Sequence, residues 1–454
     1  MIAGPHSVAV AINAGDTAWM IVATALVLLM TPGLALFYAG MVRSKSALNM
    51  MMLCLICGGV VTVIWAIYGF SLAFGDDLEG IIGGSEYLWL NGVAEKVLGG
   101  PVDGIPLMVF SAFQLAFAII ATALIAGAVA DRVRLSAWIL FTGAWATLVY
   151  FPVAHWIFAP GTKEDRGGWI FTRFDVLDFA GGTVIHLNAA AAGLALVVVV
   201  GRRIGWRRDP MRPHSIPMVL LGTALLWFGW FGFNAGSALS AGALASTVLM
   251  NTQIAAAAGA LSWIAVERIR GGRITAIGFA SGAVAGLVAV TPACGFVGTA
   301  GAFAAGIVAG AVCAIAVGWK YRAGVDDSLD VFGIHGVGAI IGMIVVGLFA
   351  SLAVNPAGEN GLFAGGGASL LGREMLAAVI VIAYSFGVTW LIAFLIEKTI
   401  GLRAPASAEL AGMDVAGQHE TAYDFTGDSV SGFVGRLRPT QRATADVGGD
   451  EESA

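Results

Sequence analysis

The chain has 454 residues, of which 58% are hydrophobic and 12% are charged, and its mean hydropathy is +0.86. Because a soluble domain carries about 25% charged residues, this composition excludes an ordinary water-soluble protein. The net charge of −5 argues against nucleic acid as a partner. Glycine occurs 63 times, about twice its usual frequency, and such small residues allow membrane helices to pack closely.

Apolar stretches of about 20 residues predict transmembrane helices. Such stretches cover 17–42, 48–74, 106–130, 135–158, 180–201, 215–236, 248–270, 273–291, 298–319, 332–354 and 373–397. We therefore expect an all-α polytopic membrane protein with eleven transmembrane helices. A short N-terminus, 1–16, precedes this membrane domain of 17–397, and a polar tail, 398–454, follows it.

Basic residues predict the orientation of the spans. Most of the 24 basic residues lie in the odd-numbered connections, which begin with Arg43 and Lys45, and in the tail. The exceptions are Lys96, Lys163, Arg166, Arg173 and Arg373. Because Lys and Arg are enriched in cytoplasmic loops, we expect the N-terminus outside and the C-terminus inside. The connections 75–105 and 159–179 are then external, and the polar tail is expected to be disordered after about residue 423.

Two sequence patterns recur in the same order in each half of the chain. The first span ends in Phe-Tyr-Ala-Gly at 37–40, and the sixth ends in Phe-Asn-Ala-Gly at 233–236. In the fifth span Gly193 follows His186 by seven residues, and in the tenth span Gly342 follows His335 by the same interval. This order predicts two five-helix halves plus one extra helix, 373–397. Since each half has an odd number of spans, the second half would be inverted, as in many transporters.

His186 and His335 are the candidate residues for a solute path. An ionisable side chain within a membrane span is costly and marks a functional site by default. The repeat would bring the two imidazoles together, where they could share a proton and contact a passing NH3 or water. Burial disfavours the charged form, so we expect a mostly neutral pair. A structural histidine bound to a backbone carbonyl is the alternative, whereas a metal site would need accompanying carboxylates or thiolates at ligand spacing.

Polar and aromatic residues near the external ends of spans are candidates for a solute entrance. Asp178 directly precedes the apolar stretch of the fifth span. Its side chain could cap the N-terminus of the helix, its negative charge could favour a cation at the external mouth, or it could do both. Aromatic faces attract cations by about 0.5–2 kcal/mol each, although an interfacial belt or a packed core would use the same residues. The aromatic candidates and the serine that follows them are Phe113, Phe117, Trp156, Phe158, Trp230, Phe233 and Ser237.

Three segments together resemble the ammonium transporter (Amt/Rh) family, specifically its bacterial Amt branch. They are 178–186 (DFAGGTVIH), 229–237 (GWFGFNAGS) and 330–336 (DVFGIHG). The resemblance runs from about Asp16 to Tyr423 and implies an eleven-helix fold with an inverted five-helix repeat. It also implies a homotrimer with one pore per subunit in the cell membrane of a bacterium.

The resemblance further implies roles for individual residues. An external recruitment site for ammonium would consist of Phe113, Phe117, Phe158, Ser237 and Asp178. Phe117 and Phe233 resemble the paired phenylalanines that gate the pore below this site. Asp178 is similar to the aspartate needed for binding or deprotonating the substrate. His186 and His335 look like the twin histidines that line the conduction path.

Two departures from the family pattern stand out. The family usually has a tryptophan three residues after the histidine of the fourth span, but this chain has Phe158 three residues after His155. Family tails often read GLDxxxHGExAY, whereas this tail reads GMD at 412–414 and QHETAY at 418–423. The resemblance implies that a PII-type regulatory protein binds the cytoplasmic tail. Because this tail departs from the family pattern, the sequence alone does not decide whether such a protein binds.

These features predict an ammonium transporter, not an enzyme, that needs no cofactor. An amine with a pKa near that of lysine loses its proton at pH 7 at a cost of about 4–5 kcal/mol, far less than the cost of moving a bare charge through hydrocarbon. We therefore expect NH4+ to be deprotonated at the entrance and NH3 to cross the pore. If the histidine pair passes the proton on, net uptake is electrogenic, which we favour. The alternatives are an electroneutral channel for NH3 or CO2 and an ammonium sensor that acts through a bound cytosolic protein.

Overall fold

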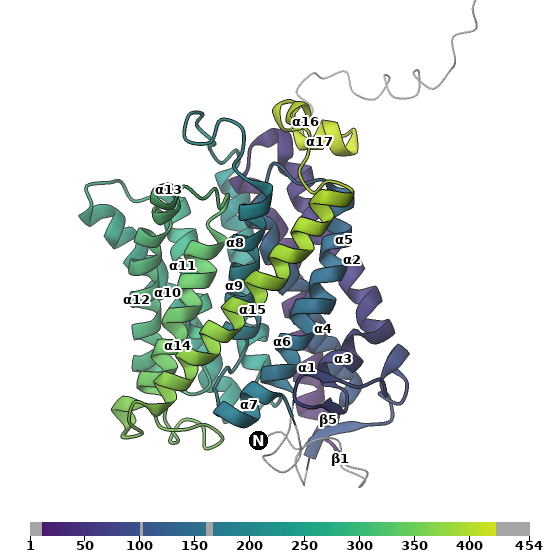
Figure 1. The fold of residues 1–454 in the computed structure, drawn as a ribbon. Helices are drawn as coiled ribbons and strands as arrows, with labels where there is room; N and C mark the ends of the chain where they lie inside the picture. Colours follow the sequence, from purple (N-terminus) through teal and green to yellow (C-terminus); the bar gives the residue numbers. More distant parts are fainter. Residues whose placement is uncertain (1–10, 100–102, 160–166, 424–454) are drawn as a thin grey trace, which may run out of the picture.

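The structure is a computed structural model that describes residues 11–99, 103–159 and 167–423. The predicted disorder after residue 423, most of the N-terminus 1–16 and part of the connection 159–179 lie outside these residues. Within the described ranges, long helices run side by side between the two ends of the molecule (Figure 1).

The first half of the chain forms five long helical segments, three of which contain a π-helical turn. They are α1 (Ala14–Met41); α2 (Ala47–Ile64) with the π turn η2 (Trp65–Gly69) and α3 (Phe70–Phe74); α4 (Leu107–Ile125) with the 3₁₀ turn η4 (Ala126–Val129); α5 (Leu135–Trp145) with the π turn η5 (Ala146–Tyr150) and α6 (Phe151–Phe158); and the π turn η6 (Gly182–Leu187) with α8 (Asn188–Val200).

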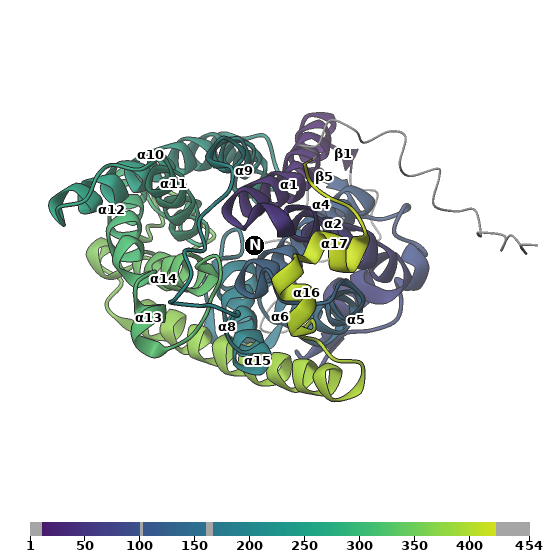
Figure 2. The same ribbon diagram turned by 90° about the horizontal axis from the view of Figure 1, so that it is seen from above.

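The second half forms a similar set of helices. They are α9 (Ile216–Gly236); α10 (Ala243–Ile269); α11 (Ala276–Val290); α12 (Thr299–Ala316) with α13 (Trp319–Ala323); and the π turn η7 (Phe332–Gly336) with α14 (Val337–Phe349). Figure 2 shows α10, α11, α12 and α14 on one side of the molecule and α1, α2, α4, α5 and α6 on the other. The longest helix, α15 (Ser369–Thr399), crosses the outside diagonally and contacts α5, α8 and α14 (Figure 1).

Ten of the described segments are long and apolar enough to cross a membrane. The exception is α11, which lies at the predicted span 273–291 but has only 15 residues. A helix of that length rises about 22 Å, less than the roughly 30 Å of a hydrocarbon core. It ends at Val290, two residues before Pro292, which has no backbone N–H to donate to a helix. The prediction of an all-α polytopic membrane protein is confirmed, with ten long spans and one short apolar helix in the described residues.

Short elements lie in the connections, and the strands among them are not indicated by the sequence. β1 (Ala11–Ile12) pairs in parallel with β5 (Asp103–Pro106), which pairs antiparallel with β4 (Val97–Gly99), and β2 (Asp77–Leu78) pairs antiparallel with β3 (Ile82–Gly83). The short helical elements are η1 (Ser44–Ser46), η3 (Leu88–Leu90), α7 (Trp169–Phe174) and η8 (Leu362–Ala364).

Glycines at helix contacts account for the unusual composition. α1 packs along α9, and a Cβ atom at Gly222 would lie 2.4 Å from the backbone nitrogen of Phe37. α11 packs along α10, and a Cβ atom at Gly286 would lie 2.1 Å from the carbonyl oxygen of Ala255. A larger residue at either position would push the two helices apart, so glycine sets the helix separation.

The tail folds back onto the end of the molecule that carries the arginine-rich connections. α16 (Ala406–Ala411) and α17 (Met413–Gln418) lie there (Figure 1). The Asp414 carboxylate accepts hydrogen bonds from the backbone N–H groups of Leu48, at 3.1 Å, and Asn49, at 2.8 Å, in the first turn of α2. The Glu409 carboxylate accepts one from Ile204, in the connection after α8, at 2.5 Å. Two separate acidic side chains therefore attach the tail to α2 and to the connection after α8.

Replacing Gly412, which joins α16 to α17, is expected to detach the tail. Gly412 has a φ of +115°, and an added Cβ would lie 2.7 Å from the backbone oxygen of Lys45. Because left-handed backbone costs a non-glycine residue about 1–2 kcal/mol, Gly412→Ala should increase amide hydrogen exchange in 406–418 by about tenfold. Gly417→Ala is the matched control, since no atom lies within 4 Å of its added Cβ. Equal exchange in both variants would contradict this prediction.

Candidate functional site

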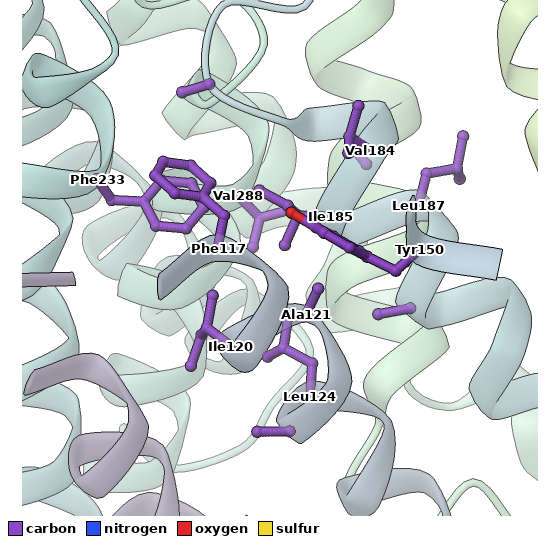
Figure 3. Close-up of a cluster of buried hydrophobic side chains, with 14 of the residues drawn as sticks. Phe117, Ile120, Ala121, Leu124, Tyr150, Val184, Ile185, Leu187, Phe233 and Val288 are labelled. Carbon is purple, nitrogen blue, oxygen red and sulfur yellow. The ribbon is translucent and has the colours of Figure 1, made fainter. Parts of the chain in front are cut away.

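Aromatic rings form a continuous buried column between α4, α9 and the two histidine-bearing turns. The ring centroids of Phe113 and Phe117 on α4 lie 4.7 Å apart, and the Phe117 ring lies 4.3 Å from that of Phe233 on α9. The Phe233 ring is 5.8 Å from the His186 ring, which is 5.3 Å from the His335 ring. All five side chains are at most 5% exposed. In Figure 3 the rings of Phe117 and Phe233 lie against each other, surrounded by aliphatic side chains.

The structure brings His186 and His335 into direct contact. Their Nδ1 atoms are 3.3 Å apart and their ring planes differ by 18°, so one imidazole donates a hydrogen bond to the other. His186 also stacks on Trp230 at 5.3 Å, and the Trp230 indole donates to the Thr291 hydroxyl at 3.0 Å. The Nε2 atom of His186 is buried and has no hydrogen-bond partner among the described residues. The pair therefore offers a polar atom inside an otherwise apolar column.

Asp178 caps the π turn that carries His186. Its carboxylate accepts hydrogen bonds from the backbone N–H groups of residues 181–184, at 2.6 to 3.2 Å. Gly181 makes this possible, because it adopts a φ of +103° at the start of the turn. Burial raises the pKa of the Asp178 carboxyl, and the N–H donors lower it in part. Since both carboxylate oxygens already accept hydrogen bonds, the negative charge would act on a nearby cation mainly through space.

Asp327 does the same for the π turn that carries His335. Its carboxylate accepts hydrogen bonds from the backbone N–H groups of Val331, at 3.0 Å, and Phe332, at 2.8 Å. Asp327 precedes His335 by eight residues, which is also the interval between Asp178 and His186. Asp327 is absent from the residues predicted above, and this repeated Asp-to-His interval is the signal that would have identified it.

A cavity of about 290 Å³ opens next to Asp178, away from the tail. Phe158, Asp178 and Ser237 line it, together with Phe171 of α7. Three of the residues predicted for recruitment therefore share one cavity, whereas Phe113 and Phe117 belong to the buried column. The two features adjoin, because a Cβ at Gly236, next to Ser237, would lie 2.8 Å from the Phe113 ring.

Trp156 does not replace the missing tryptophan of the cavity. Its ring packs against Trp169 at 5.5 Å and Tyr384 at 4.5 Å, and its indole donates to the carbonyl of Ile81 at 2.8 Å. It is not among the residues that line the cavity. Phe158 is therefore the aromatic side chain that α6 presents to the cavity.

Two buried polar residues near the site are absent from the residues predicted from the sequence. Tyr150 lies in the π turn η5, and its ring extends toward Ile185 in Figure 3, with a hydroxyl that has no hydrogen-bond partner among the described residues. Glu374 near the start of α15 is 0% exposed, and its carboxylate accepts the backbone N–H of Leu177 at 2.6 Å. Its neighbour Arg373 donates to the carbonyl of Phe174 at 3.0 Å. α15 thus holds the segment that leads into Asp178.

A bundle of membrane spans around a buried column, with a cavity at one end, defines a polytopic membrane transport protein. The sequence profile of the Ammonium Transporter Family matches residues 18–423. The chain therefore belongs to the ammonium transporter family, and this membership agrees with the prediction that it is not an enzyme.

Relatives and solved structures agree with this assignment. The chain is 51% identical to the ammonium transporter of Mycobacterium tuberculosis over 433 residues, which cover 91% of each chain. It is 44% identical to the ammonium transporter of Bacillus subtilis, over 90% of this chain and 98% of that one. The structure is similar to Mep2 of Saccharomyces cerevisiae, with a TM-score of 0.79 and 34% identity over 87% of this chain and 88% of that one. It is also similar to a sensor Amt protein, with a TM-score of 0.79 and 30% identity over 88% and 98%.

Replacing Glu374 is expected to shift the segment that carries Asp178. Glu374→Leu removes the acceptor of the Leu177 N–H, and an unsatisfied buried donor costs about 1–3 kcal/mol. Since Asp178 follows directly in the chain, we expect the KM for ammonium uptake into vesicles to rise by about threefold or more. Glu374→Gln keeps an acceptor oxygen in the same place and should restore the wild-type KM. If the leucine variant kept that KM, the positioning role of Glu374 would be wrong.

Proposed function

We propose that this protein takes up ammonium electrogenically across the cell membrane of a bacterium. NH4+ is recruited at the cavity beside Asp178, loses its proton, and crosses the buried column as NH3. The observation that carries this proposal is the contact between His186 and His335 at 3.3 Å, at one end of a row of buried rings. Such a column has no residue that could neutralise a permanent cation.

Recruitment combines a hydroxyl, aromatic faces and a negative charge. Ser237 and Phe158 are half-buried at the cavity wall and can replace part of the hydration shell of NH4+. The face of Phe158 would contribute about 0.5–2 kcal/mol to cation binding. Asp178 would add attraction through space, and Phe113, which contacts Gly236 next to Ser237, would be the first ring of the column.

Phe117 and Phe233 form the gate in this proposal. Their ring centroids are 4.3 Å apart, so a hydrated ion cannot pass between them. Deprotonation costs ammonium about 4–5 kcal/mol at pH 7, and NH3 then needs only a small opening between the rings. K+ has no proton to release and would have to cross as a bare charge, which costs far more.

The histidine pair is the proposed path for the proton. One imidazole already donates to the other through Nδ1, and the Nε2 atom of His186 is buried without a partner among the described residues. A proton that follows NH3 along this pair makes transport electrogenic, and each transferred charge then gains about 2.3 kcal/mol per 100 mV of membrane potential. That coupling would concentrate ammonium inside the cell.

Solid-supported-membrane recordings on proteoliposomes test the proposal directly. Addition of ammonium to wild-type protein should evoke a current that K+ does not evoke. NH3 flux without any current would overturn the electrogenic part and favour an electroneutral gas channel. The absence of both flux and current would instead favour a sensor, which is what one structural neighbour at 30% identity is called.

Removing either histidine tests the proton path. His186→Ala and His335→Ala should keep the fold but reduce the preference for ammonium over K+ by about tenfold or more, because the path that carries the proton separately from NH3 is lost. His214→Ala is the control, since His214 bonds to Val42 and Tyr423 at the end of the molecule near the tail. Unchanged current and unchanged K+ exclusion in both pore variants would refute the role of the pair.

Restoring the family's tryptophan tests the role of Phe158. Because tryptophan is the strongest aromatic cation binder, Phe158→Trp should lower the KM for ammonium by about two- to fivefold. The same substitution at Phe279, which is exposed on α11, should leave the KM unchanged. Equal KM values in the two variants would exclude Phe158 from recruitment.

We also propose eleven crossings, with α11 as the short one, the N-terminus outside and the C-terminus inside. The two halves would be inverted repeats, and α15 the extra helix. In support, η6 with α8 and η7 with α14 each begin at an aspartate-capped π turn and continue as a 13-residue helix. They run antiparallel, because Thr183 at the start of η6 bonds to Met343 in α14 at 3.4 Å, whereas Gly193 in α8 packs near Val331.

The proposed organisation is an external N-terminus (1–16), a membrane domain (17–397) and a cytoplasmic regulatory tail (398–454). The attachment of Asp414 to α2 and of Glu409 to the connection after α8 supports a regulatory role for the tail, because a bound protein could change these contacts. A PII-type protein is the partner that we propose at this face. A homotrimer with one pore per subunit rests on the family resemblance.

A further inference from the structure

The cavity beside Asp178 is much larger than an ammonium ion needs. Its volume is about 290 Å³, whereas an ion of the size of a water molecule occupies about 30 Å³. Among the described residues that line it, the only polar side chains besides Asp178 are those of Ser237 and Asn355. Its aromatic lining is richer than the sequence predicts, because three further phenylalanines join Phe158. They are Phe171, Phe179 and Phe296.

The polar groups of this cavity leave few acceptors for the N–H bonds of ammonium. Both carboxylate oxygens of Asp178 accept hydrogen bonds from backbone N–H groups of residues 181–184. The amide oxygen of Asn355 accepts a backbone N–H at 3.0 Å, and the Ser237 hydroxyl donates to a backbone carbonyl at 2.9 Å. Ammonium would therefore keep much of its water here. A cation without N–H donors needs none of these acceptors, so it fits the lining better.

Phe179 and Phe296 form one fixed wall of the cavity. Their ring centroids are 5.5 Å apart and their ring planes differ by 89°. The Phe179 backbone N–H donates to the carbonyl of Pro292 at 3.1 Å. The Phe179 ring packs on Gly295, where an added Cβ would lie 2.1 Å from it. Rings that are held in place before a ligand binds lose little freedom on binding, so more of the contact energy appears as affinity.

Phe171 reaches the cavity from α7, which a chain of hydrogen bonds holds in place. The backbone N–H of Trp169, the first residue of α7, donates to the carbonyl of Gly80 at 3.1 Å. The Gly80 N–H donates to the Asp77 carboxylate at 2.8 Å, and the same carboxylate contacts the fully buried His155 at 2.9 Å. Through this chain α6 fixes the position of α7, and with it the wall that Phe171 forms.

We propose that this cavity binds a quaternary ammonium cation, which blocks transport from the cavity side. Aromatic faces attract such cations, Asp178 adds its negative charge, and the methyl groups fit against the aliphatic side chains of Leu239 and Leu244. A quaternary nitrogen has no proton to release, so the cation cannot pass the rings of the column as a neutral molecule. Binding depends on the cavity alone, whereas the block rests on the function proposed above.

Isothermal titration calorimetry of the full chain with tetramethylammonium tests the binding. Wild-type protein should bind tetramethylammonium more tightly than K+, because K+ needs oxygen ligands. Phe171→Leu should weaken this binding by about two- to thirtyfold, the range expected for one cation–π contact. Phe171→Trp keeps an aromatic face and should bind at least as tightly as wild type. Phe363→Leu is the matched control, since Phe363 is 68% exposed in η8 and does not line the cavity.

Solid-supported-membrane recordings test the block. Tetramethylammonium added with ammonium should raise the apparent KM for ammonium and leave the maximal current unchanged. It should evoke no current by itself. In Phe171→Leu the same rise in KM should require about two- to thirtyfold more tetramethylammonium, whereas Phe363→Leu should behave as wild type.

Several results would overturn the proposal. Wild-type affinity for tetramethylammonium no higher than for K+, or equal affinity in Phe171→Leu and Phe363→Leu, would show that the cavity is not the site. A lower maximal current at an unchanged KM would place the block elsewhere. A current carried by tetramethylammonium itself would make it a substrate. A protein that gives no ammonium current but binds tetramethylammonium through Phe171 would overturn the proposed function alone and support the binding.

Discussion

The contact between two imidazoles within a membrane protein is the interaction on which the rest of the structure depends. Polar groups inside a bilayer must find partners within the protein, and His186 and His335 find each other at 3.3 Å. Each lies in a π turn, which inserts one residue and changes the direction of the side chains that follow. Such a turn needs acceptors for its first N–H groups, and Asp178 and Asp327 supply them. The contact between the two histidines therefore depends on two aspartates, each of which caps the π turn that carries one histidine.

Both aspartate segments are in turn held by arginines from other elements. Arg373 donates to the carbonyl of Phe174, just before Asp178, at 3.0 Å. At the other end the fully buried Arg132 donates to the carbonyl of Asp326, directly before Asp327, at 2.7 Å. Burial raises the pKa of the Asp326 carboxyl, but hydrogen bonds from Arg203 outweigh it and hold the pKa below its usual value. The Asp326 carboxylate therefore stays charged at neutral pH and keeps its ion pair with Arg203.

Hydropathy is a sum over about 20 residues, so the helix positions could be predicted from the sequence, including α11 where the helix is short. The histidine pair could also be predicted, because a repeated interval to glycine places His186 and His335 in equivalent positions. The π turns could not, since they depend on carboxylates such as that of Asp178 outside the span. Glu374 was equally hidden, because its partner Leu177 is distant in sequence and carries no polar side chain. Tertiary hydrogen bonds leave no local periodicity.

In the proposed mechanism the cavity binds the cation and the adjoining column selects it. As the proposed recruitment site, Ser237, Phe158 and Asp178 would attract any small cation, so this stage need not distinguish NH4+ from K+. If Phe117 and Phe233 form the gate that we propose, their contact would then admit only a species that has lost its charge. Discrimination thus comes from chemistry, the ability to release a proton, and not from size. A site that bound NH4+ tightly would gain nothing, because the bound cation must still give up its proton before it can pass the rings.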